Sequence, residues 1–225
     1  TIGINVSSDF ALADGLSHGE YLGLVDALSA EQKSKIVSAE NLAVAWLETR
    51  TESEMEIYPS IVEVAHNIIA EGLSANVIKP GRTTTEDVQW WYRERVRELH
   101  LQVWFHPSVT FQRNGETGDL QGVILPGDLL HVDFGITYLR LNTDTQQHAY
   151  VLMEGEQAPP VGLRQGLATS NRLQDILVNN FIVGRTGNEI LRSARETAIG
   201  EGILPSIYTH PIGYHGHGAG PTIGM

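Results

Sequence analysis

Two aspartates lie close together in a segment that is otherwise rich in apolar and small residues. Asp133 and Asp144 are eleven residues apart within the stretch LLHVDFGITYLRLNTDT. If the flanking segments form neighbouring antiparallel strands, a register that sets Asp133 opposite Asp144 points both side chains to one face, with Cβ atoms roughly 5 Å apart. The pattern therefore predicts a pair of carboxylates on one face of a buried hairpin.

Two carboxylates at this separation repel each other strongly where water is scarce. The two carboxylates need a shared proton or a cation. Two divalent ions roughly 3.5–4 Å apart are one arrangement that stabilises both carboxylates in their ionised form. The alternative is that each aspartate is a solvated strand-end or turn residue, because Asn142 and Thr143 also suit a turn. The spacing by itself leaves both interpretations open.

Three histidines cluster near the end of the sequence. His210, His215 and His217 fall within eight residues of the stretch THPIGYHGHGAGPTIGM, among five glycines. Glycine lets the backbone approach a bound group closely, and neutral imidazole is the commonest nitrogen ligand of divalent metals. The segment therefore indicates one wall of a site. The alternative is a flexible glycine-rich loop with solvated histidines.

The composition restricts the class of protein. The chain has 225 residues, a formal net charge of −12 and no cysteine. An acidic surface repels nucleic-acid phosphates, and without cysteine any metal must be bound by carboxylates and imidazoles, which favours hard ions. No apolar run reaches the roughly 18–20 residues of a membrane span, and no signal-peptide pattern opens the chain. We expect a soluble, cytoplasmic protein that binds neither nucleic acid nor membrane.

Helical patterns precede the two aspartates. Apolar spacing predicts a helix capped by Ser38, and a second over residues 52–72 that Pro59 should bend or restart. A third helix should begin at a capping box formed by Thr83 and Glu86. The first part of the chain therefore runs helix, helix, helix.

β-prone segments follow these helices, with the sequences QVWFHPSVTFQ, DLLHVDFG and QQHAYVLM. Period-two alternation places His131 on the same strand face as Asp133, which makes it a candidate outer partner of a metal ligand. The alternative, which the pattern favours, is an ordinary packed or exposed strand histidine. The opening residues 1–36 alternate only weakly and are interpreted as a linker.

An internal repeat relates two parts of the chain. The sequence GRTTTEDV at Gly81 returns as GRTGNEIL at Gly184, and FHPSV at Phe105 returns as THPIG at Thr209, at offsets of 103 and 104 residues. Each copy contains a Thr-x-x-Glu capping box that opens a helix. The matches predict two helix-plus-strand units related by a pseudo-twofold axis, with a cleft between them. The alternative is chance reuse of common helix-start and His-Pro sequences.

These motifs resemble the creatinase, prolidase and methionine aminopeptidase superfamily, which has the pita-bread fold. Its members share a DFG-like aspartate, a second aspartate eleven residues later, a GHGxG histidine and two later glutamates, which together bind two metal ions. The first three correspond to Asp133, Asp144 and His217. The resemblance covers residues 38–225, and VIKPGRTTTEDV is similar to the corresponding segment of bacterial Xaa-Pro aminopeptidases and prolidases.

The resemblance implies an α+β pita-bread fold of two pseudo-symmetric halves, each of helices plus antiparallel strands. Residues 1–36 would be a linker and the tail of a preceding N-terminal domain. Residues 37–225 would be the catalytic domain, with halves at about 37–156 and 157–225. Both family glutamates would lie beyond the last residue, so we expect this domain to be C-terminally incomplete and the segment by itself to be inactive.

The implied activity is that of a metal-dependent exopeptidase which removes the first residue of Xaa-Pro peptides through a water activated by two divalent ions. Asp133 would bind one ion or both, Asp144 would bridge them, and His217 would bind one. Manganese is the expected metal, with cobalt or zinc as substitutes. The implied partners are a peptide with proline at its second position and a second copy of the chain in a homodimer.

The catalytic histidine is the point at which the sequence departs from the family pattern. Prolidase-like members carry a further histidine four residues before the His217 position, where this chain has Gly213. His215 and His210 are therefore the two candidates for the catalytic role. A creatinase-like hydrolase that acts without metal, and a non-catalytic binding protein of the same fold, are the alternative functions.

Overall fold

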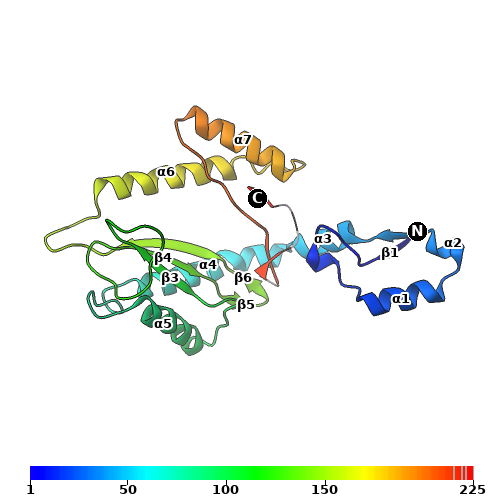
Figure 1. Ribbon diagram of the computed structural model, residues 1–225, viewed down its shortest axis with the longest axis horizontal. Coiled ribbons are helices and arrows are strands. Elements are labelled where there is room, and N and C mark those ends of the chain that lie inside the picture. The colour runs from blue at the N-terminus through cyan, green and yellow to red at the C-terminus, as the bar shows by residue number, and fades with distance from the viewer. Residues whose placement is uncertain (215, 219, 221, 225) are drawn as a thin grey trace.

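The structure is a computed structural model and describes residues 1–214, 216–218, 220 and 222–224. Figure 1 shows an elongated molecule with the N-terminal segment at one end and the largest sheet at the other. The histidine-rich segment near the C-terminus runs between these two parts. Segments far apart in the sequence therefore meet near the middle of the molecule.

The N-terminal segment contains regular structure. Its elements are β1 (Ile2–Ile4), a 3-10 turn (Ala11–Ala13), α1 (His18–Ala27), α2 (Ala30–Lys33) and β2 (Ile36–Ser38). β1 pairs with β2 in parallel, and serine capping boxes open both helices. Residues 1–36 thus contain regular secondary structure. Their assignment to a linker and the tail of a preceding domain stays a prediction.

Three further helices follow: α3 (Glu40–Glu48), α4 (Glu52–Gly72) and α5 (Thr85–Glu98). α4 continues through Pro59 without restarting. The expected cap of α5 was wrong by one residue, because Thr84 and Asp87 form the capping box. Thr83 has a different function: its Oγ1 accepts a hydrogen bond from the Lys79 N–H at 2.9 Å and closes the preceding turn.

The cap of α3 was also displaced by one residue. The N-cap is Ala39, which makes no side-chain capping bond. Ser38 lies one position earlier, at the end of β2, and its Oγ accepts a hydrogen bond from the Glu40 N–H at 3.1 Å. The serine therefore still satisfies one free amide of the helix start.

The largest sheet is antiparallel and has the order β3–β4–β7. Its strands are β3 (Ser108–Gln112), β4 (Leu129–Phe134) and β7 (Thr145–Tyr150), while β5 (Thr137–Tyr138) and β6 (Leu141–Asn142) form a separate hairpin between β4 and β7. Along β4, Leu130, Val132 and Phe134 are fully buried. They pack with residues of α4 and α5 in one hydrophobic core. Alternation therefore turns Asp133 to the opposite face.

A second unit follows with a core of its own. Its elements are α6 (Val161–Val178), α7 (Gly187–Gly200), β8 (Ile212–Gly213) and β9 (Gly216–His217). Thr186 and Glu189 form the expected capping box of α7. The small core contains Ile176, Ile190, Ala194, Ala198, Ile207 and Ile223. Two helix-plus-strand units thus follow each other along the chain, as the repeat predicts.

Among the described residues, no helix combines the length and apolar character that crossing a membrane requires.

The packing of α4 against α5 provides a stability test at Gly72. A Cβ at this position would lie 2.4 Å from Cε1 of the fully buried Tyr92. We expect Gly72→Ala to lower the free energy of unfolding by about 1–3 kcal/mol through overpacking. Gly166→Ala is the matched control, because nothing lies within 4 Å of its Cβ position inside α6.

The control should raise the free energy of unfolding by about 0.5–1 kcal/mol, because alanine favours a helix more than glycine does. Urea denaturation followed by circular dichroism measures both variants. Equal effects of the two substitutions would contradict the close contact between Gly72 and Tyr92.

Candidate metal centre

Asp133 occupies the penultimate position of β4, on the face opposite the hydrophobic core. Its side chain is half-buried, and its Oδ1 atom is buried without a hydrogen-bond partner among the described residues. Burial raises the pKa of this carboxyl group, and the neighbouring charge of Asp144 raises it further, while His131 and His217 act in the opposite direction. This buried oxygen can accept a hydrogen bond but has no donor in the described part of the chain, and it lies beside a second carboxylate. Such a site favours a cation.

Asp144 lies one residue before β7, and the predicted register was wrong by two residues. Asp133 pairs with Gln146, and Phe134 pairs with Thr145. The hairpin of β5 and β6 takes up the intervening chain and displaces the start of β7. A shift of two residues keeps every side chain on its face, so Asp144 still approaches Asp133. The effect of Asp144 on the Asp133 pKa reflects this proximity.

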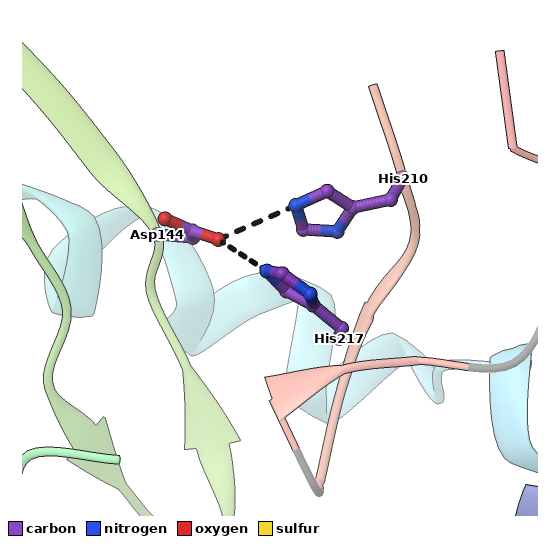
Figure 2. A group of neighbouring side chains, drawn as sticks. All are labelled: Asp144, His210 and His217. Carbon is purple, nitrogen blue, oxygen red and sulfur yellow. Dashed lines mark ion pairs between the residues drawn. The ribbon is translucent and has the colours of Figure 1, made fainter. Parts of the chain in front are cut away.

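His210 and His217 meet the same oxygen of Asp144. The distance from Asp144 Oδ2 to Nε2 is 3.5 Å for each histidine. Figure 2 shows both imidazoles, which come from the C-terminal segment, pointing at this carboxylate. One ligand atom from each of the three residues lies within 4.8 Å of the other two. The structure therefore brings together two predicted metal ligands, Asp144 and His217, and one predicted catalytic histidine, His210.

The hydrogen bonding of His210 determines which of its nitrogens can bind a ligand. Its Nδ1 lies 2.9 Å from the Pro211 carbonyl oxygen, which can only accept, so Nδ1 carries the hydrogen. In the neutral ring, Nε2 then has the lone pair and faces Asp144 Oδ2. Two acceptors 3.5 Å apart are stabilised by a proton on the ring or by a cation between them. The donor set therefore fits a divalent metal.

The indole of Trp104 contacts all three segments that bear the predicted ligands. Its Nε1–H donates to the Thr143 carbonyl oxygen at 2.8 Å, immediately before Asp144. Its ring meets the His217 imidazole edge-on, with ring centroids 5.4 Å apart. A Cβ added at Gly135 or Gly216 would lie 2.6 Å or less from the indole, so both positions must lack a side chain. Trp104 therefore fixes the relative positions of these segments.

A buried asparagine joins the β5–β6 hairpin to the histidine-rich segment. Asn142 is 2% exposed, and its Nδ2 donates to the carbonyl oxygens of Gly213 at 2.5 Å and Tyr214 at 3.0 Å. Arg50 donates to the Ile212 carbonyl oxygen at 2.7 Å. The backbone between His210 and His217 is thus held from both the hairpin and the α3–α4 connection.

These supporting residues were missed by the sequence reasoning. Asn142 was read only as a possible turn residue, although a polar residue directly after an apolar strand position could have indicated a buried amide. Trp104 and Arg50 carry no local signal, because the residues of the site to which they donate hydrogen bonds lie 39 or more residues away in the sequence. His215, the other predicted catalytic histidine, lies outside the described residues.

A cavity of about 630 Å³ adjoins the cluster, with residues of α3, α4 and the second unit in its walls, and His210 is part of its lining. Arg50, Met55, Tyr58 and Phe181 also contribute to its walls. The lining combines apolar and polar side chains, as ligand pockets commonly do. His210 therefore lies between the carboxylate cluster and a space large enough for a small ligand.

The chain matches known proteins at the level of family and fold. The model of the metallopeptidase family M24 matches residues 60–224. A search of curated proteins gives no significant match. The structure is similar to the crystal structure of an X-Pro aminopeptidase from Thermotoga maritima, with a TM-score of 0.66 and 18% identity. That match covers 94% of this chain and 58% of the other.

Two further solved structures are similar to a comparable degree. For a prolidase from Thermococcus sibiricus, the TM-score is 0.65 with 15% identity, over 93% of this chain and 56% of the other. For a Xaa-Pro dipeptidase from Bacillus anthracis, the TM-score is 0.62 with 20% identity, over 92% and 57%. The chain thus spans less than two thirds of the length of these structures. Their similarity confirms the expected α+β pita-bread class.

The family match begins within α4 and includes the sheet, both aspartates and the histidine-rich segment. It therefore covers every residue of the cluster described above. The chain belongs to metallopeptidase family M24.

Proposed function

We propose that this chain supplies the metal-binding face of an exopeptidase that hydrolyses the bond after the first residue of Xaa-Pro peptides. The observation that carries the proposal is the meeting of one Asp144 oxygen with two imidazoles beside the half-buried Asp133. Family membership supports peptide hydrolysis. The preference for proline is supported by the names of the similar structures, an X-Pro aminopeptidase and a Xaa-Pro dipeptidase.

Asp133, Asp144 and His217 would hold the divalent cations. Asp144 lies beside the Asp133 carboxyl group and also faces the imidazoles, which is the location that a bridging ligand requires. The chemistry that divalent cations supply at such a site is Lewis acidity, which lowers the pKa of a water molecule and polarises a scissile carbonyl group. The ligand set is rich in oxygen, which favours manganese, with cobalt or zinc as substitutes.

His210 is the candidate proton-transfer residue that the geometry supports. Its Nδ1–H is anchored on the Pro211 carbonyl oxygen, so Nε2 is the nitrogen that can take or give a proton beside the carboxylates. It also forms part of the cavity wall, where a bound peptide could reach it. His215 stays the alternative catalytic residue. A homodimeric assembly, implied by the family resemblance, belongs to the same proposal.

The metal ligands can be tested by binding without reference to catalysis. We expect the chelator-treated protein to bind manganese, and Asp144→Asn to weaken that binding by more than the roughly 10- to 100-fold typical of losing an outer hydrogen-bond partner. His217→Gln should have a similar effect. Asp119→Asn, at an exposed carboxylate beside Gln112, is the control. Electron paramagnetic resonance of free manganese measures the affinities, and unchanged binding in Asp144→Asn would refute the assignment.

Trp104 should act as a positioning residue for this centre. Trp104→Phe keeps an aromatic ring but removes the hydrogen bond to the Thr143 carbonyl oxygen. We expect manganese affinity to fall roughly 10- to 100-fold, because the segments bearing Asp144 and His217 lose a shared support. Trp46→Phe, at an indole that is 78% exposed, should leave the affinity unchanged. Equal affinities of wild type and Trp104→Phe would remove the positioning role.

The activity itself is tested on the intact protein with a Xaa-Pro dipeptide and the matching Xaa-Ala dipeptide, with and without added manganese. We expect manganese-dependent release of the first residue, with faster turnover of the Xaa-Pro substrate. Metal-independent turnover of a guanidino compound would instead indicate a creatinase-like hydrolase. Failure to cleave any substrate while manganese is bound would favour a non-catalytic binding protein.

A further inference from the structure

Two histidines outside the candidate centre face each other on the outer side of the main sheet. His131 on β4 pairs directly with His148 on β7, and their ring centroids are 5.0 Å apart. Directly opposed residues of antiparallel strands project to the same face, with Cβ atoms about 4.5–5.5 Å apart. The backbone register therefore holds the two imidazoles next to each other.

A glutamine fixes the tautomer of the first histidine. His131 Nε2 lies 2.9 Å from Gln146 Oε1. An amide oxygen only accepts hydrogen bonds, so Nε2 carries the hydrogen and the lone pair of the neutral ring is on Nδ1. Metal-binding histidines typically donate their second ring N–H to a neighbouring acceptor in this way. Gln146 thus orients His131 as a metal-binding histidine is oriented.

The second histidine is accessible and tends to be neutral. His148 is exposed at its position on β7, an edge strand of the three-stranded sheet, and it adjoins a cavity of about 340 Å³ between β7 and α6. Partial burial lowers the pKa of His148, and the nearby His131 lowers it further. A neutral imidazole with access to solvent is the form that binds metal ions.

We propose that His131 and His148 form a second metal site that takes a borderline divalent transition ion of the nickel, zinc or copper class. Imidazole ligands without a carboxylate favour these ions over manganese, and the positions that the two histidines leave open can be filled by water. Asp133 lies two residues further along β4, about 7 Å away at the usual strand rise. The two sites therefore have different ligands, although His131 is close enough to influence the Asp133 carboxyl group. The proposal does not rest on the proposed function.

Nickel alone is the probe, titrated by calorimetry into the intact, chelator-treated protein. We expect His148→Gln and His131→Gln each to weaken one nickel-binding event by at least about tenfold, since one imidazole remains. Gln146→Leu should preserve the stoichiometry but weaken the same event by roughly tenfold, because it removes the outer hydrogen-bond partner. His66→Gln is the matched control, at an exposed histidine on α4. Its titration should match that of wild type.

Asp144→Asn separates this proposal from the function proposed above. This substitution should weaken nickel binding at the candidate centre, which His148→Gln leaves unchanged, and should not affect nickel binding at His131 and His148. Circular dichroism and melting without metal check the fold of each variant, and the exposed His148 provides the test if the half-buried His131 does not tolerate substitution. Unchanged nickel affinity and stoichiometry in a folded His148→Gln variant would overturn the second site, whatever Asp144→Asn shows.

Discussion

The site depends on bringing the half-buried carboxyl group of Asp133 close to a second carboxylate. Desolvation and like charge both disfavour the ionised pair, and both raise the pKa of Asp133. The chain compensates by presenting two imidazoles to Asp144 from a segment more than sixty residues later in the sequence. The sheet, the hairpin and the histidine-rich segment must therefore be held in fixed positions. Asn142 and Trp104 provide that link through backbone carbonyl oxygens.

Much of this arrangement followed from local sequence patterns. Alternation along β4 correctly placed His131 on the same face as Asp133, and the intervening Val132 is buried on the opposite face. The capping box of α7 was also predicted, since it depends only on residues three apart. The pairing register between β4 and β7 was harder to predict from the sequence. The β5–β6 hairpin consumes residues that a simple strand pairing would assign to β7, and nothing local encodes that choice.

The contacts that organise the site could not be predicted for a related reason. Trp104 and Thr143 are 39 residues apart, and Asn142 reaches Gly213 across 71 residues. Side chains of this kind have no periodic signature, because their partners are backbone atoms whose placement depends on the completed fold. The metal-binding assignment itself came from the family resemblance of Asp133, Asp144 and His217, and it stays a proposal.

The two units share an order of helices followed by strands but differ in chemistry. His106 precedes β3 as His210 precedes β8, yet His106 lies 3.0 Å from an Arg93 nitrogen while His210 faces Asp144. Of these two histidines, His210 is the one with an ion-pair distance to a carboxylate among the described residues. Repetition of the scaffold therefore did not duplicate the site.

The two-residue displacement of β7 has a consequence for how the β5–β6 hairpin can change length. If inserting or deleting one residue between Gly135 and Asp144 made β7 slide by one position along β4, the second acid would point to the opposite side of the sheet. A slide of two positions would preserve that side. Length changes that the hairpin does not absorb should therefore come in even steps, which makes parity, and not total length, the quantity that the chemistry constrains.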